Sequence, residues 1–210
     1  MGLFITFEGI EGSGKTTQVT LAGEYLDGRN VSFLVTSEPG GCDLGKELRR
    51  LLLESASPWI SERAELFLFA ADRAQHVEEI ILPALKEKAI VLCDRYCDAT
   101  IAYQGYGRGL DLEVINIVNN YAARSLKPDH TILLDVHPER GLERVRSRSS
   151  AKEKNDRFEG EQLEFHRRVR EGYLSRAKAE PRRFHIINAD ADVDDVFEQV
   201  KSILSEILGS

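Results

Sequence analysis

The sequence predicts a three-layer α/β fold, in which a parallel sheet of roughly five strands lies between helices. Two observations predict this fold. Five short runs are almost continuously apolar, as in strands buried on both faces, and segments with helical periodicity separate them. The runs are residues 3–7, 31–36, 89–93, 131–134 and 184–187. Because crossovers between parallel strands are right-handed, this alternation indicates a doubly wound sheet.

A glycine-rich loop follows the first strand. It matches the pattern G-x-x-x-x-G-K-[ST], with the residues Gly9, Ile10, Glu11, Gly12, Ser13, Gly14, Lys15 and Thr16. In this pattern backbone N–H groups surround phosphate oxygens, the lysine reaches the outer phosphates, and the threonine hydroxyl can bind magnesium. Helical spacing continues from Lys15 to Gly28, so a phosphate would lie at a helix N-terminus.

The alternative to a functional loop is a chance glycine-rich turn. The strand before the loop and the helix after it favour a P-loop instead. The sequence therefore predicts a P-loop NTPase fold that binds a nucleoside triphosphate through residues 9–16, with Thr17 beside them.

Composition narrows the class of protein. The 210 residues are 42% apolar and 30% charged, which is ordinary for a globular domain. The net charge of −7 predicts no general affinity for nucleic acid or membrane. No apolar run approaches the roughly 18 residues of a spanning helix, and no signal peptide is recognised. The three cysteines fit neither a disulfide framework nor a zinc site, so we expect the protein in the cytoplasm. The length of the chain suits a single domain, residues 1–210.

Proline and glycines after the second strand predict a loop at residues 37–41. A short helix follows, with Arg49 near the rim of its apolar face. Ser57 and Pro58 are typical of a helix start, and the long helix after them is expected to run to about residue 88 with a kink at Pro83.

An arginine continues the apolar stripe of this long helix. Phe69 and Arg73 are i,i+4 neighbours on one face. An aromatic ring beside a guanidinium would suit a nucleotide base and its phosphate. The alternative, a core phenylalanine and an arginine paired with a carboxylate, is the commoner arrangement.

Two strands end in an aspartate that could help to hold magnesium: Asp94 after the third strand and Asp135 after the fourth. Arg95 follows Asp94 directly, which suits a site for both magnesium and a second phosphate. We therefore prefer Asp94, and expect Asp135 to cap or orient a loop. Further on, Thr100 and Gln104 share a helix face, where a hydroxyl and an amide can contact the edge of a base.

A basic stretch lies between residues 140 and 157 of this acidic chain. It favours a mobile lid over a polyphosphate, at about residues 146–158. The alternative is a solvated charged loop. A helix at 161–179, the last strand and a C-terminal helix with regular apolar spacing complete the domain, and the last of these predicts core packing.

A P-loop alone is shared by switches, motors and small-molecule kinases. Arginines from separate elements, Arg49, Arg73 and Arg95, exceed what one triphosphate needs, and a basic lid excludes water. Both features favour a kinase for a phosphorylated acceptor. The Asn-Lys-x-Asp pattern of guanine-selective switches is not found.

The chain resembles the thymidylate kinase family in several motifs, which follow the order of that family. They are residues 7–18 around the P-loop, Glu38-Pro39-Gly40-Gly41, Leu68-Phe69-Ala70-Ala71-Asp72-Arg73, Asp94-Arg95-Tyr96, Ala102-Tyr103-Gln104-Gly105, Gly107-Arg108-Gly109 and, in the lid, Asp156-Arg157-Phe158-Glu159. The resemblance implies phosphorylation of dTMP to dTDP with ATP and Mg²⁺, by an enzyme that is usually a homodimer.

The resemblance also implies roles for single residues. Phe69 would stack on thymine, and Arg73 and Gln104 would contact its edge, with Thr100 at a position that is often Ser. Arg49 and Arg95 would bind the monophosphate, and Glu11 would lie near the sugar 3′-hydroxyl. Thr16 and Asp94 would hold magnesium beside Lys15.

One subgroup of the family carries a catalytic arginine in the P-loop, where this chain has Gly12. The chain therefore resembles the subgroup that supplies the arginine from the lid, with Arg148 and Arg157 as the catalytic candidates and Arg146 as a further contact to ATP. A departure from the family is Ser37, which stands where an arginine is usual. Arg49 or Arg95 would then compensate in the acceptor pocket.

Overall fold

The computed structural model describes residues 2–53, 60–149, 157–159 and 161–209, with the backbone alone at 148 and 149, and it contains the predicted parallel sheet. Its strands are β1 (Leu3–Glu8), β2 (Phe33–Ser37), β3 (Ile90–Asp94), β4 (His130–Asp135) and β5 (Phe184–Asn188). Their order is β2-β3-β1-β4-β5, and all neighbours are parallel. The predicted strand bounds hold to within two residues.

The strand order places β1 in the centre, between β3 and β4. The chain builds one half of the sheet with β2 and β3 and then crosses to the other side for β4 and β5. A crevice forms at the carboxyl ends of the strands where the order reverses in this way. The P-loop leaves β1 at this point.

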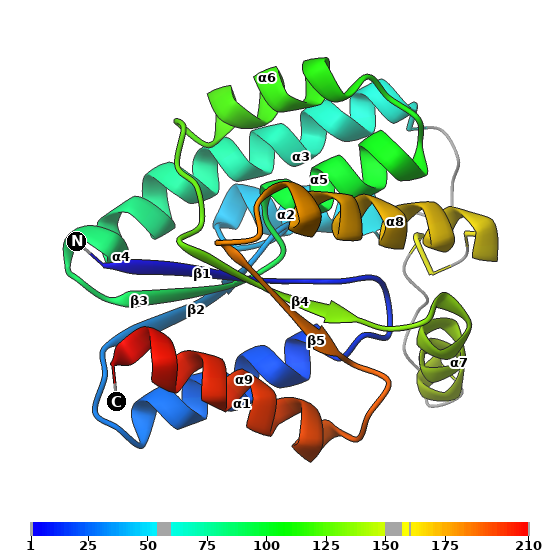
Figure 1. The fold of residues 1–210 in the computed structure, drawn as a ribbon. Coiled ribbons are helices and arrows are strands. Elements are labelled where there is room, and N and C mark those ends of the chain that lie inside the picture. Colours follow the sequence, from blue (N-terminus) through cyan, green and yellow to red (C-terminus); the bar gives the residue numbers. More distant parts are fainter. Residues whose placement is uncertain (1, 54–59, 150–156, 160, 210) are drawn as a thin grey trace.

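Helices form the two outer layers (Figure 1). Their bounds are α1 (Lys15–Asp27), α2 (Asp43–Leu53), α3 (Glu62–His76), α4 (Leu82–Lys86), α5 (Cys97–Thr100), α6 (Leu112–Ala122), α7 (Pro138–Ser149), α8 (Leu163–Ala179) and α9 (Val193–Leu208), with π-helical segments η1 (Val77–Ile81) and η2 (Ile101–Gly107). In Figure 1, α1 and α9 cover one face of the sheet, whereas α2, α3, α5, α6 and α8 lie over the other. The helix α7 lies at the edge of the molecule, beyond the end of β4.

The main core joins the sheet to α1 and α9 and also to η2 and α8. Val19, Ala22 and Leu26 form the buried face of α1, as their spacing predicts. The C-terminal helix α9 buries Val196, Val200 and Leu204, which confirms its packing role. No helix among the described residues is both long enough and apolar enough to cross a membrane.

The long helix differs from its predicted form at its start, whereas its end at Lys86 lies within two residues of the predicted one. Residues 57 and 58, the predicted start, lie outside the described ranges. The helix α3 begins at Glu62, with Ser61 as its N-cap accepting a hydrogen bond from the Ala64 N–H. The predicted kink at Pro83 takes the form of the wide turn η1 directly before α4. Since proline cannot donate a backbone hydrogen bond, a local π-helical turn next to it is a usual accommodation.

Candidate active site

The P-loop is preformed for a phosphate. Gly9, Gly12 and Gly14 all have φ values in the left-handed half of backbone space, at 147°, 70° and 88°. The helix α1 begins directly after Gly14, and no side chain caps it. Its first N–H groups therefore remain available to an anion, where the helix dipole adds to the attraction. The Lys15 Nζ donates to the Ile10 carbonyl at 2.9 Å, so its charge lies inside the loop.

The predicted magnesium ligands meet in the structure. Residue Phe7 of β1 pairs with Asp94 of β3, and the Thr16 hydroxyl donates to Asp94 Oδ2 at 2.8 Å. The described residues contain no cluster of three or more His, Cys, Asp or Glu side chains that could hold a metal. One hydroxyl and one carboxylate fit Mg²⁺, which commonly keeps several waters and takes its other ligands from nucleotide phosphates.

The other candidate magnesium ligand, Asp135, binds an arginine. Both of its oxygens accept hydrogen bonds from Arg170 of α8, at 2.6 and 2.8 Å. This pair fixes α8 against the end of β4. It supports the expectation that Asp135 has an orienting role.

Arg95 lies immediately beside the P-loop. Its backbone is left-handed at φ 71°, which is strained for an arginine. The surrounding contacts hold it there, since Arg95 N–H donates to the Phe7 carbonyl and its Nη1 to the Gly9 carbonyl at 3.2 Å. Beneath it, buried Glu8 accepts hydrogen bonds from the Tyr96 N–H and the Tyr173 hydroxyl. Burial first, and then Asp98, raises the pKa of Glu8 to about 8.

Glu11 joins the P-loop to the helices above it. Its Oε1 accepts hydrogen bonds from the Tyr103 hydroxyl at 2.5 Å and from Arg95 Nη2 at 2.9 Å. Its Oε2 lies 3.1 Å from Nδ1 of His166. Burial would raise the pKa of Glu11, but His166, Arg95 and Lys15 outweigh it and lower this pKa to about 2. Glu11 is therefore a fixed negative charge in the site.

The contacts of Phe69 and Arg73 bear on the commoner of their two sequence interpretations. Arg73 is 1% exposed, and its Nε and Nη2 bind Glu38 Oε2 at 2.9 and 2.8 Å. Its Nη1 donates to Asn119 at 2.7 Å. The commoner arrangement, an arginine paired with a carboxylate, is thus present. Phe69 and Arg73 also line the same cavity.

This cavity has a volume of about 450 Å³ and runs from the P-loop to α3, η2 and the end of β3. It gathers most of the predicted site. The predicted residues that line it are Glu11, Gly12, Gly14, Lys15, Thr16, Thr17, Arg49, Phe69, Arg73, Asp94, Arg95, Thr100 and Gln104. Gly9, Ile10 and Ser13 belong to the same P-loop without lining it.

Glu65, which the sequence did not single out, organises the far end of the cavity. It is 1% exposed and accepts a hydrogen bond from Gln104 Nε2 at 2.7 Å. Arg108 Nε donates to the same oxygen at 3.3 Å, and Arg157 pairs with the other. Its spacing offered a signal, since Glu65 lies four residues before Phe69 and so continues the stripe of Phe69 and Arg73.

The lid candidates are only partly placed. Arg157 lies at Glu65, and burial lowers its pKa. Arg146 is exposed on α7. The side chain of Arg148 and lid residues 150–156 lie outside the described ranges. A neighbour that the sequence did not single out, Arg144, donates to the carbonyl of Gly12 at 3.3 Å and to that of Ala189 at 2.8 Å.

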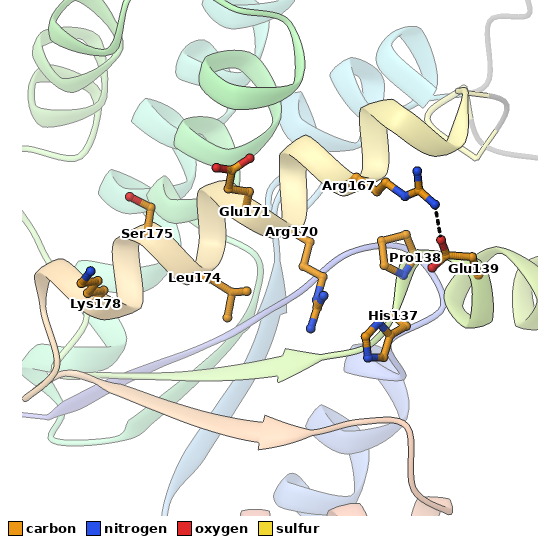
Figure 2. Close-up of a pocket in the computed structure, with 9 residues that line it drawn as sticks. All are labelled: His137, Pro138, Glu139, Arg167, Arg170, Glu171, Leu174, Ser175 and Lys178. Carbon is orange, nitrogen blue, oxygen red and sulfur yellow. Dashed lines mark hydrogen bonds and ion pairs between the residues drawn. The ribbon is translucent and has the colours of Figure 1, made fainter.

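A second hollow, of about 510 Å³, lies between α8 and the turn from β4 to α7 (Figure 2). Its walls carry both signs of charge, and Arg167 pairs with Glu139 across its rim at 2.6 Å. Of the residues that the structure describes, those lining this hollow include none of the predicted site residues. The predicted phosphate-binding residues that line a cavity therefore line the first one.

Comparison with known proteins decides the family. The family model for Thymidylate kinase matches residues 7–200. The chain belongs to the thymidylate kinase family. A thymidylate kinase of Pelobacter propionicus is 51% identical over 202 residues, covering 95% of this chain and 92% of that protein. One from Solidesulfovibrio magneticus is 49% identical over 209 residues, with 98% and 100% covered.

A solved thymidylate kinase structure, from Ehrlichia chaffeensis, shares the fold as well. It superimposes with a TM-score of 0.76 at 38% identity and covers 97% of this chain and 98% of that one. Membership of the thymidylate kinase family makes the protein a nucleoside monophosphate kinase with a P-loop NTPase fold, as the motifs predicted.

Proposed function

We propose that the protein transfers the γ-phosphoryl group of ATP to dTMP, giving dTDP for dTTP synthesis and DNA replication. The observation that carries the proposal is the single cavity that contains both the P-loop and the Phe69–Arg73 pair. A regulatory ATPase needs only the first half of it. A kinase needs both halves, so that donor and acceptor meet over the P-loop.

Phosphoryl transfer depends on positioning and on neutralising the charge of the moving group. The open N-terminus of α1 and Lys15 would bind the outer phosphates of ATP, with Arg146 and Thr17 as further contacts. Thr16 and Asp94 would hold Mg²⁺, which offsets negative charge on the phosphates when bound. The lid residues Arg148 and Arg157 would supply the remaining positive charge in the transition state.

The acceptor half suits a thymine nucleotide. The ring of Phe69 offers a stacking surface, and Thr100 lines the same cavity. The amide nitrogen of Gln104 already donates to Glu65, which leaves its oxygen to accept from the N3–H group of thymine. Arg49, Arg73 and Arg95 would hold the base edge and the monophosphate.

We also propose a homodimer in the cytoplasm. The helix α6 exposes apolar side chains at helical spacing, among them Ile117 and Tyr121 at 70% and 88% exposure. Phe67 of α3, a helix that packs against α6, is also exposed. A second copy of the chain would cover this face. Three free thiols, at Cys42, Cys93 and Cys97, suit a reducing compartment.

The test of this function measures ADP released from ATP and Mg²⁺ with and without dTMP, dUMP, dCMP and AMP. Strong stimulation by dTMP alone is the expected result. The thymine methyl group contributes about 1–3 kcal/mol, so dUMP is expected to be a poor substrate. Hydrolysis that no acceptor stimulates would favour a regulatory ATPase, and stimulation by another monophosphate would favour a different nucleotide kinase.

A further inference from the structure

His166 is completely buried in the first turn of α8, next to exposed Arg167. Its Nδ1 lies 3.1 Å from Oε2 of Glu11, at the top of the P-loop. The helix α8 follows the predicted lid in the chain, so this contact joins the segment after the lid to the phosphate-binding loop.

The two oxygens of Glu11 have different neighbours. Oε1 accepts hydrogen bonds from Tyr103 and Arg95, which line the acceptor cavity. Among the described residues, His166 is the neighbour of Oε2. The orientation of this carboxylate therefore depends on contacts from both sides.

Packing alone does not account for a histidine at this position. Among the described residues neither ring nitrogen has a hydrogen-bond partner and neither does Glu11 Oε2, but Nδ1 lies 3.1 Å from that oxygen, so Glu11 is the polar group closest to the ring. A buried polar ring with one polar contact costs free energy that an apolar side chain of similar size would not. The neighbouring Phe165 and Val169 fill the core in that apolar way.

We propose that His166 is a positioning residue for the acceptor, which orients Glu11 to accept a hydrogen bond from the 3′-hydroxyl of the deoxyribose. This inference rests on the proposed function and on the role near the 3′-hydroxyl that the family resemblance implies for Glu11. It predicts that a change at His166 weakens binding of an acceptor only if that acceptor carries a 3′-hydroxyl.

The test compares His166→Asn with His166→Gln. Asparagine places its amide nitrogen close to the position of Nδ1, whereas glutamine places it near Nε2. Calorimetry on the full chain then gives dissociation constants for dTMP and for its 3′-deoxy analogue. In His166→Gln we expect about 10-fold weaker binding of dTMP, with binding of the analogue changed less than about 2-fold. In His166→Asn we expect dTMP affinity within about 3-fold of the wild type.

Val169→Ala, one turn further along the buried face of α8, is the control for lost packing. It should change both affinities by the same factor. Equal losses for dTMP and its analogue in both His166 variants would overturn the positioning role. A wild-type protein that does not phosphorylate dTMP would instead contradict the proposed function, so the two failures are distinguishable.

Discussion

The backbone of Gly12 in the P-loop lies against that of Gly141 in α7. A Cβ atom on Gly12 would stand 2.1 Å from the Gly141 carbonyl oxygen, and one on Gly141 would stand 2.5 Å from the carbonyl oxygen of Glu11. The start of α7 thus occupies the space that a side chain at position 12 would need. An arginine at position 12 would therefore need the backbone of α7 to move, and α7 leads directly into the basic segment predicted as the lid.

This contact predicts a difference between two glycines of the same loop. Gly12 and Gly14 both have positive φ, but a Cβ on Gly14 meets nothing within 4 Å. Gly14→Ala should cost about 1 kcal/mol from backbone strain, and Gly12→Ala roughly 2 kcal/mol more, because backbone atoms must also move. Thermal unfolding should therefore show a lower Tm for Gly12→Ala by about 4–8 °C. Equal Tm values would contradict the tight packing.

The second prediction concerns the metal ligands. Asp94→Asn should lower kcat by about 100-fold and raise the Mg²⁺ concentration needed for half-maximal rate, since it removes a charge beside Thr16. Asp135→Asn is the matched control, because Asp135 also ends a strand next to β1 but is bound by Arg170. Its Mg²⁺ dependence should match the wild type. A shift in Asp135→Asn alone would reverse the assignment.

The lid arginines give the third prediction. Arg148→Ala or Arg157→Ala should lower kcat by about 1000-fold while raising the KM for dTMP far less, as expected of an arginine finger. Arg50→Ala is the control, since exposed Arg50 pairs with Glu47 on α2. Unchanged kcat in both lid variants would remove these arginines from catalysis.

The fourth prediction concerns stability and pH. Burial, and then Glu38, raises the pKa of Asp72 to about 6. A carboxyl whose folded pKa exceeds its unfolded value destabilises the fold once it is ionised. The wild type should therefore lose about 2 kcal/mol relative to Asp72→Asn as the pH rises from 4 to 7.

Urea unfolding across this pH range measures the difference between the two proteins. Asp43→Asn is the control with the opposite sign, because the hydrogen bond from Lys46 lowers the pKa of exposed Asp43. A difference between wild type and Asp72→Asn that does not change with pH would contradict the buried, ionised carboxyl.

The strands were predictable because burial on both faces leaves a continuous apolar run, which few other elements produce. The start of the long helix could not be predicted from the sequence. Ser57 and Ser61 both have the chemistry of an N-cap and lie four residues apart. A shift of about one turn keeps every apolar residue on the same face, so periodicity does not choose between them.

The residues of the candidate site also divide into those that the sequence predicts and those that it does not. Lys15, Thr16 and Asp94 follow from local motifs in which neighbouring residues fix the geometry. Glu65 and His166 meet the site only through tertiary contacts, and each is an isolated polar residue within a helical pattern. Such a pattern does not say which part of the protein the polar side chain will face, because that depends on how the helices pack.

The wide turn η2 sets one constraint of a different kind. Residues before and within it, Thr100 and Gln104, line the acceptor cavity, while Arg108 directly after it reaches Glu65. A π-helical segment holds one more residue than an α-helix of the same length. Deleting a single residue from it would therefore leave an α-helix of the same length, in which Arg108 keeps its place while side chains within the segment change direction. The wide turn thus sets the direction of the side chains between Thr100 and Arg108, whereas the elements on either side of it would keep their places.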